Sequence, residues 1–190
     1  MNIMCIGDSI TAGYGLSSNE NWVYLMNKSL NHSFINKGIN GDTSTGLLMR
    51  FKKDVIDFKS DMCFIMIGIN DMMLNTTPES IIKNIGIIIK DAVNSNIIPI
   101  IISQPPINKS IAITLWDEHL NYDKISLKQT HLNNLFKDFC SSKDILFIDV
   151  FSYFKSMCNS ENYHSDGIHL NSYGNLELTK FISQEIQSLF

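Results

Sequence analysis

The stretch Ile6-Gly7-Asp8-Ser9-Ile10-Thr11-Ala12-Gly13 follows the apolar residues Ile3-Met4-Cys5 at the start of the chain. An apolar run that ends in glycine and polar residues indicates a buried strand, which leads into a loop and then a helix. Gly7 permits the sharp backbone turn that such a junction needs. Ligands of open α/β sheets bind just beyond the carboxyl ends of the strands. The sequence therefore places Ser9 where a nucleophile could meet a substrate, although Asp and Ser are also ordinary loop and capping residues.

Apolar runs of strand length recur along the chain. They lie at residues 2–6, 33–37, 62–67, 97–102 and 144–149. Segments with helical spacing of apolar residues alternate with them, at residues 20–30, 45–53, 77–94, 123–139 and 171–190. This alternation predicts a parallel sheet with right-handed crossovers. We therefore expect an α/β fold in which a single domain over residues 1–190 forms a three-layer α/β/α sandwich. Its five-stranded parallel sheet should have the flavodoxin-like order 2-1-3-4-5.

Two parts of the chain depart from this pattern. Pro99 lies inside the fourth predicted strand, although proline cannot donate a hydrogen bond to a sheet. The segment Gln104–Lys124 is long and irregular, and it carries Trp116 and several other apolar residues. Because it follows the fourth strand, it should lie beside Ser9. It would either pack onto the domain or form a flexible wall for an acyl chain, and the residues leave both interpretations open.

The composition is that of an ordinary globular protein: 190 residues, 44% hydrophobic and 18% charged, with a net charge of −4. No run of like charges points to a nucleic acid or an anionic membrane, and Arg50 is the only arginine. No apolar run approaches the roughly 18–20 residues that cross a membrane. The start of the chain lacks the basic leader of a signal peptide. We therefore expect a cytoplasmic protein without stable membrane insertion, whose oligomeric state stays open.

The cysteines are widely spaced along the chain. They stand at Cys5, Cys63, Cys140 and Cys158, and none belongs to a Cys-x-x-Cys pair. Two of them fall inside predicted strands, where a free cysteine is usually a small buried hydrophobe. We expect all four to be reduced and structural.

An acid and a histidine stand three residues apart near the end of the chain, at Asp166 and His169. At this spacing the aspartate can hold one ring nitrogen while the other faces a nucleophile, as in a serine hydrolase triad. A tetrahedral intermediate also needs hydrogen-bond donors. The N–H groups of Ser9 and Gly41 and the side-chain amide of Asn70 could supply them. The Gly-x-Ser-x-Gly elbow of α/β-hydrolases is absent, so a different fold would have to perform this chemistry.

These residues stand in four sequence blocks: Gly7-Asp8-Ser9, Gly41, Gly68-x-Asn70-Asp71 and Asp166-x-x-His169. In their order, and over almost the whole chain, the blocks resemble the signature blocks of the SGNH (GDSL) hydrolase family. The stretch Gly7–Leu16 with Trp22 is similar to the bacterial lysophospholipase/acyl-CoA thioesterase I branch. Ile10 replaces the leucine of the usual motif, and Ile69 replaces a glycine that is usual in this branch.

The resemblance implies Ser9 as the nucleophile, His169 as the base and Asp166 as the triad acid. It implies an oxyanion hole at Ser9, Gly41 and Asn70, and a reaction without metal or cofactor. The sequence thus predicts a serine esterase or acylhydrolase that acts on small-molecule esters or thioesters of short to medium acyl chains. The reaction would pass through an acyl-enzyme on Ser9.

Other polar residues near these blocks have competing interpretations. Asp8 is expected to cap a helix or hold its loop, and Asp71 to brace the loop in which it lies. His164 could bind a metal ion together with Asp166 and His169, but no further His or Cys stands at ligand spacing.

The glycine-rich motifs do not point to nucleotide binding. Gly41–Gly46 superficially resembles a phosphate-binding loop, but Leu47 occupies the position that needs lysine. Gly13-Tyr14-Gly15 lacks the third glycine of a dinucleotide fingerprint. Two functional alternatives stay open: a deacetylase of O-acetylated carbohydrate, and a catalytically silent binding module on the same fold.

Overall fold

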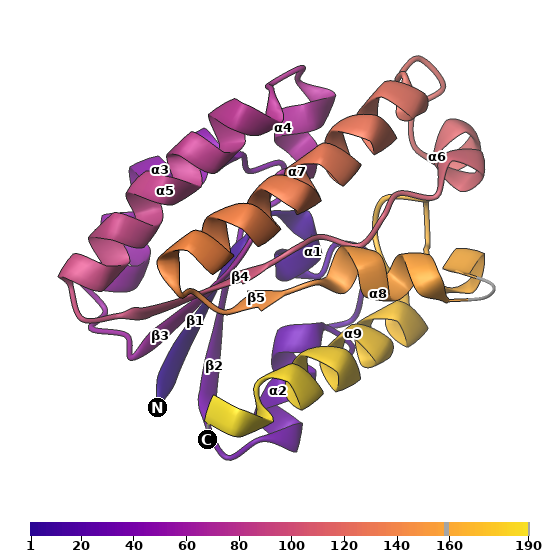
Figure 1. Ribbon diagram of the computed structural model, residues 1–190. Helices are drawn as coiled ribbons and strands as arrows, with labels where there is room; N and C mark the ends of the chain where they lie inside the picture. Colours follow the sequence, from indigo (N-terminus) through magenta and orange to yellow (C-terminus); the bar gives the residue numbers. More distant parts are fainter. Residues whose placement is uncertain (158–159, 190) are drawn as a thin grey trace.

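The computed structural model describes residues 1–157 and 160–189, which fold around a parallel sheet of five strands (Figure 1). The strands are β1 (Asn2–Gly7), β2 (Ser33–Gly38), β3 (Met62–Met66), β4 (Ile98–Ile102) and β5 (Phe147–Ile148). Their order in the sheet is β2-β1-β3-β4-β5, and each neighbouring pair is parallel. This arrangement confirms the predicted fold class and strand order.

Helices cover both faces of the sheet (Figure 1). They are α1 (Ser9–Ala12), α2 (Trp22–Ser29), α3 (Ser44–Phe51), α4 (Ile69–Met73), α5 (Pro78–Asn94), α6 (Lys109–Leu115), α7 (Tyr122–Lys143), α8 (Val150–Ser156) and α9 (Ser172–Glu185). A π-helical turn, Lys52–Ile56, continues α3, and 3₁₀ turns occupy Ser160–Tyr163 and Gln187–Leu189. The core residues of α3, α5 and α7 lie on one face of the sheet, and those of α2, α8 and α9 on the other.

Burial of both faces explains why the strands are continuously apolar in sequence. In β1, Ile3 and Cys5 belong to the core beneath α2 and α9, whereas Met4 and Ile6 belong to the core beneath α3 and α5. Successive strand residues point to opposite faces, so every position of β1 after Asn2 must be apolar or small. The parallel strands bring their carboxyl ends, and the loops that carry the candidate residues, to one edge of the sheet.

The structure corrects the predicted end of the sheet. The fifth strand, expected over residues 144–149, is limited to Phe147–Ile148. The helix before it is longer than expected, since α7 continues to Lys143. Asp144 then ends α7 in the left-handed conformation, with φ 54°, and donates its N–H to the carbonyl of Cys140. Residues 144 and 145 therefore leave the helix, and Leu146 contributes only its carbonyl to the sheet, where it accepts from the N–H of Ile101.

Two other predicted segments also differ. The segment Gln104–Lys124 is not irregular throughout, because it contains α6. The side chain of Asn108 caps this helix by accepting a hydrogen bond of 3.2 Å from the N–H of Ile111. The final helix, expected to reach Phe190, ends at Glu185 and gives way to a 3₁₀ turn. Phe190 itself lies outside the described residues.

Pro99 is accommodated because β5 is short. Along β4, the N–H of Ile98 donates to Asp61 on the β3 side, and the N–H of Ile101 donates to Leu146 on the β5 side. These directions alternate along a parallel strand, so residue 99 faces the β5 side. The pairing of β4 with β5 begins only at Ile101. The missing N–H of Pro99 therefore removes no hydrogen bond from the sheet.

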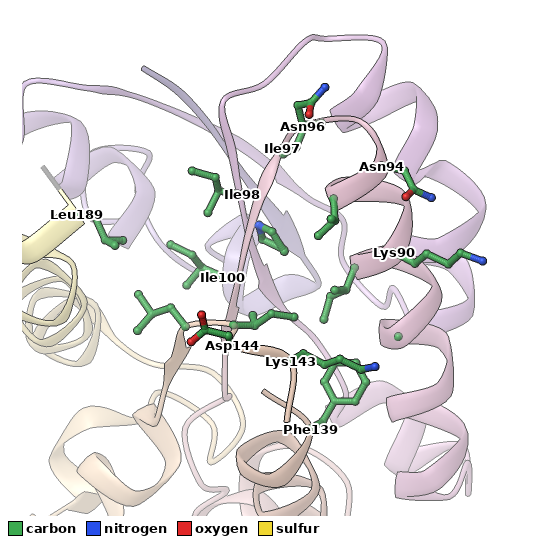
Figure 2. Close-up of a pocket in the computed structure, with 16 residues that line it drawn as sticks. Lys90, Asn94, Asn96, Ile97, Ile98, Ile100, Phe139, Lys143, Asp144 and Leu189 are labelled. Atoms are coloured by element: carbon green, nitrogen blue, oxygen red, sulfur yellow. The ribbon is translucent and has the colours of Figure 1, made fainter. Parts of the chain in front are cut away.

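A cavity of about 950 Å³ opens beside this unpaired part of β4 and is lined by residues of α5, the end of α7 and Leu189 (Figure 2). Its wall is mostly apolar and includes Ile98, Ile100 and Phe139, with Lys90 and Asp144 among the polar residues. The cavity lies at the amino ends of β4 and β5. Ser9 follows the carboxyl end of β1, so this cavity is at the opposite end of the sheet from the candidate site.

Cys5, Cys63 and Cys140 are buried free thiols. Burial raises the pKa of all three, and that of Cys140 reaches about 12. Such thiols are poor nucleophiles, in agreement with the structural role expected for them. The prediction for Cys158 lies outside the described residues.

Candidate active site

Ser9 lies at the point where β1 gives way to α1. Gly7 ends the strand in a position that no side chain could occupy, because a Cβ there would lie 2.2 Å from the carbonyl oxygen of Met66. Asp8 caps α1 by accepting a hydrogen bond of 3.0 Å from the N–H of Ile10. Ser9 is then the first residue of α1, with 6% of its surface exposed. Its N–H has no acceptor within the helix, as is usual for first-turn donors.

The imidazole of His169 lies between Ser9 and Asp166. Its Nε2 is 2.8 Å from the Ser9 hydroxyl oxygen, and its Nδ1 is 2.7 Å from Oδ2 of Asp166. A carboxylate can only accept, so Nδ1 carries the hydrogen and Nε2 is left to accept from the serine. Three residues from opposite ends of the chain thus form one continuous hydrogen-bonded chain.

Asp166 is held as a carboxylate by its own turn. Its second oxygen accepts hydrogen bonds of 2.9 and 2.8 Å from the N–H groups of Ile168 and His169. Burial alone would raise the pKa of Asp166, but these bonds and the one from the imidazole outweigh it and lower the pKa below its ordinary value. Gly167 makes the turn possible, since its φ is 89° and a Cβ would lie 2.3 Å from the N of Ala112.

The loops after β2 and β3 carry the other two candidate donors. Gly41 has φ 76°, and a Cβ added to it would meet no atom within 4 Å, so the space where a side chain would lie is open. Asn70 is half-buried at the start of α4. Its side-chain nitrogen donates a hydrogen bond of 2.9 Å to the carbonyl of Asp42, the residue after Gly41. The two predicted donors therefore belong to loops that are joined to each other.

Asp71 reinforces the same junction. Its carboxylate accepts from the N–H of Ser44 at 2.8 Å and from the Ser44 hydroxyl at 2.6 Å. Burial raises the pKa of Asp71, although both bonds from Ser44 oppose the rise. The expectation that Asp71 braces its loop agrees with this geometry, in which it fastens α4 to the start of α3.

Arg50 is a structural arginine that the sequence did not identify as part of the site. Its guanidinium bonds the carboxylate of Asp42 at 2.7 Å, that of Asp54 at 2.8 Å and the carbonyl of Gly7 at 3.0 Å. It thereby links the end of β1 to the loop that carries Gly41. All of these partners belong to the same chain, so its only arginine is already engaged.

Gln104 is a second residue that the sequence reasoning missed. Its Nε2 donates a hydrogen bond of 2.7 Å to Oδ2 of Asp8, and its Oε1 accepts one of 2.7 Å from the N–H of Ile69. Burial raises the pKa of Asp8 to about 7, although its hydrogen-bond donors and the nearby imidazole of His169 oppose the rise. The available signal was a polar residue shortly after an apolar strand, two positions beyond Ile102, as at the other candidate positions.

Two aromatic rings cover the imidazole. The ring of Tyr14 has its centroid 4.5 Å from that of His169, and the ring of Trp116 lies at 5.0 Å. Tyr14 is 45% and Trp116 40% exposed, whereas His169 is 2% exposed. The sequence left open whether Trp116 belongs to the core or to a substrate groove. The structure places it on α6's carboxyl end, half in solvent and against the candidate base.

His164 does not join Asp166 and His169 in a metal-binding cluster. Its Nε2 lies 3.0 Å from the carbonyl oxygen of Pro106. Over residues 1–157 and 160–189, no group of three or more His, Cys, Asp or Glu side chains has an arrangement suited to a metal ion. The geometry therefore gives no support to the metal interpretation of these residues.

Comparison with known proteins places these features in a family. The family model of the GDSL-like lipase/acylhydrolase family matches residues 5–176. Esterase TesA of Pseudomonas aeruginosa is 32% identical over 89 residues, which are 44% of each chain. An arylesterase of Vibrio mimicus is 29% identical over 112 residues, 55% of this chain and 56% of the relative. The matched part thus spans about half the length of these curated relatives.

Solved structures extend the likeness of the fold to the whole chain. A member of the lipolytic protein G-D-S-L family from Veillonella parvula has a TM-score of 0.85 at 22% identity, with 100% of both chains covered. A lipase/acylhydrolase from Enterococcus faecalis has a TM-score of 0.81 at 23% identity, over 98% of this chain and 95% of that one. With the family model matched over residues 5–176, the chain belongs to the GDSL-like lipase/acylhydrolase family.

Proposed function

We propose that this protein is a serine esterase in which Ser9 is the nucleophile, His169 the general base and Asp166 the residue that orients the base. The observation that carries the proposal is the hydrogen-bonded chain Ser9–His169–Asp166, with lengths of 2.8 and 2.7 Å. A hydroxyl at this distance from a neutral imidazole nitrogen can lose its proton as it attacks a carbonyl carbon. Asp166, kept ionised by its turn, then stabilises the imidazolium that forms.

The oxyanion of the tetrahedral intermediate would be bound by the N–H groups of Ser9 and Gly41 and by the side chain of Asn70. An amide nitrogen carries two hydrogens, so the bond from Asn70 to Asp42 leaves one for a substrate oxygen. His169 then donates its proton to the leaving group, and an acyl-enzyme remains on Ser9. Water activated by the same imidazole releases the acid.

The leaving group must lie beside His169, because Nε2 has to reach its oxygen. Tyr14 and Trp116 border this side of the site, since both rings contact the imidazole. Half-exposed aromatic rings favour a flat or apolar alcohol portion. The Vibrio mimicus relative is named an arylesterase, which agrees with this chemistry. A coenzyme A thioester is less favoured, because Arg50 is engaged by Asp42 and Asp54 and no second arginine exists.

We further propose that the substrates are small esters of short to medium acyl chains, that residues 1–190 form one domain and that the protein acts in the cytoplasm. Among the described residues, no helix has the length and apolar character needed to cross a membrane. The alternative activity, removal of acetyl groups from O-acetylated carbohydrate, uses the same mechanism. Hydrolysis of acetylated saccharides without hydrolysis of aryl esters would favour that alternative.

Labelling with a fluorophosphonate probe tests the proposal directly. The probe reacts with an activated serine, and peptide mapping should find it on Ser9 and should find none in Ser9→Ala. A panel of acetyl, butyryl, octanoyl and palmitoyl esters then tests the chain-length range. Labelling at another serine would refute the assignment of the nucleophile, and a strong preference for palmitoyl esters would refute the range.

A further inference from the structure

We propose that Gln104 is a positioning residue that fixes the nucleophile loop of Ser9 against helix α4, where the proposed oxyanion donor Asn70 lies. This inference rests on the proposed function and extends it to a residue outside the four sequence blocks. Gln104 follows the end of β4, and 5% of its surface is exposed. It lies 96 residues from one of its partners and 35 from the other.

One side chain joins the immediate neighbours of both functional residues. The Gln104 amide donates to the carboxylate of Asp8, which precedes Ser9, and its carbonyl accepts from the N–H of Ile69, which precedes Asn70. Both bonds are 2.7 Å long and buried. Any displacement of the Ser9 loop from α4 must stretch or break one of them.

The donors and acceptors around Gln104 allow only one orientation of its side-chain amide. A backbone N–H can only donate, so Oε1 of Gln104 must face Ile69 and Nε2 must face Asp8. Asp8 must therefore accept, and its other oxygen already accepts from Ile10. The ionised carboxylate suits this pair of donors best, because both of its oxygens can only accept. His169 and Asp71 also act on this carboxylate, the first favouring its charged form and the second opposing it.

In the part of the chain that the structure describes, the other side-chain hydrogen bonds of α4 do not reach the nucleophile loop. Asn70 bonds the carbonyl of Asp42, and Asp71 bonds Ser44, so they connect α4 to the loop after β2 and to the start of α3. Gln104 supplies a side-chain connection from α4 to Asp8 in the nucleophile loop. Nucleophilic attack and oxyanion binding require the serine oxygen and the oxyanion donors at fixed positions relative to each other. A displacement of about 1 Å can lower the rate roughly a hundredfold. We therefore expect the loss of the bridge to lower kcat more than it raises KM.

Gln104→Met removes both hydrogen bonds while it retains a flexible side chain of similar length. Gln129→Met is a matched control, because Gln129 is also buried and accepts from Ile107 at 3.2 Å and donates to Pro105 at 2.6 Å. Its bonds do not involve Asp8 or α4. With an activated aryl ester, Gln104→Met should lower kcat roughly ten- to a hundredfold with KM within about twofold. Gln129→Met should keep kcat within about threefold of wild type.

A second test exchanges the hydrogen-bond donor and acceptor between Gln104 and Asp8 and asks whether the double variant recovers the kcat that each single variant loses. In Asp8→Asn, the new amide faces the Gln104 amide, and both cannot donate to each other. In Gln104→Glu, two carboxylates face each other with no donor between them. A proton shared by the pair at low pH would restore the contact, so the variants are compared at alkaline pH. In the double variant, the asparagine amide donates to one glutamate oxygen and Ile69 donates to the other, so both bonds are restored. Each single variant should lower kcat, and the double variant should recover to within about fivefold of wild type.

Two results would overturn the inference. One is a kcat of Gln104→Met that equals that of Gln129→Met. The other is a double variant whose kcat does not exceed that of the slower single variant. If Gln104→Met does not fold, this second result is sufficient to reject the inference. Ser9→Ala in the same assay keeps the proposed function separate. An active Ser9→Ala would refute the serine mechanism, whereas an inactive Ser9→Ala beside a wild-type-like Gln104→Met refutes only the role of Gln104.

Discussion

The ring of Tyr14 lies over the imidazole of His169, with the two centroids 4.5 Å apart and the planes inclined at 36°. Tyr14 comes from the loop after α1, so it reaches the candidate base from the same segment that carries Ser9. The imidazole is thereby shielded from water on one face while its two nitrogens bond Ser9 and Asp166. Segment Gly7–Tyr14 thus supplies both the proposed nucleophile and a cover for its base.

Removal of either partner of the central hydrogen bond should abolish ester hydrolysis. Ser9→Ala removes the proposed nucleophile, and His169→Ala removes the base that activates it. Because the two act as one unit, the losses should be comparable, and the double variant should be little worse than either single one. Steady-state kinetics with an activated aryl ester measure this. Turnover close to wild type in either single variant would refute the triad assignment.

Asn70→Ala should lower kcat roughly a hundred- to a thousandfold, which is the usual effect of a lost oxyanion-hole donor. The substitution also removes the bond from Asn70 to Asp42. Asn84→Ala is the control for the loss of a structural hydrogen bond, because Asn84 bonds Ser44 and Thr45 of α3. This variant should change kcat little. If Asn70→Ala changed KM alone, Asn70 would bind the substrate and would not stabilise the oxyanion.

The fold and the proposed triad could be predicted because each depends on local sequence patterns. Continuous apolar runs identify strands that are covered on both faces, and Asp166 and His169 stand three residues apart. Their catalytic roles, and those of Gly41 and Asn70, stay predictions. The geometry shows where they lie and which loops they join.

Gln104 and α6 could not be predicted in the same way. The partners of Gln104 come from the ends of two other strands, so its role depends on how β1, β3 and β4 are aligned in the sheet. Helix α6 has only seven residues and exposes Ile113 and Leu115, so its apolar residues lack a clear buried stripe. In both cases the deciding information lies in tertiary contacts.

The stability contributed by Asp8 should decline as pH rises. Burial raises its pKa in the folded protein to about 7, whereas an aspartate in the unfolded chain titrates near 3.9. Between these values the folded state binds more protons, so rising pH favours unfolding. The free energy of unfolding of wild type minus that of Asp8→Asn should fall from about pH 4 to about pH 7 and then level off. Chemical denaturation at several pH values measures it. A difference that rises over this interval would contradict the raised pKa.

Gly167→Ala should damage both stability and activity. At φ 89° a left-handed conformation costs an alanine about 1–2 kcal/mol, and its Cβ would also lie 2.3 Å from the backbone of Ala112. The turn that aligns Asp166 with His169 would have to move. Gly15→Ala is the matched control, because Gly15 has φ 77° but open space around it. Thermal unfolding and kcat should show a larger loss for Gly167→Ala, and equal losses would indicate backbone strain alone.

Trp116→Ala should change the selectivity for the leaving group more than the selectivity for the acyl chain. The centroid of the indole ring lies 5.0 Å from that of His169 and 6.1 Å from that of Tyr14. In the proposed mechanism, this is the side where the departing alcohol receives its proton. Loss of an aromatic contact should lower kcat/KM for phenyl acetate relative to ethyl acetate by roughly two- to tenfold. The comparison of this ratio between wild type and variant cancels the intrinsic reactivity of the two esters. Leu115→Ala, an exposed apolar neighbour on the same helix, should leave the ratio unchanged. An unchanged ratio in Trp116→Ala, or an equal change in both variants, would remove Trp116 from the leaving-group side of the site.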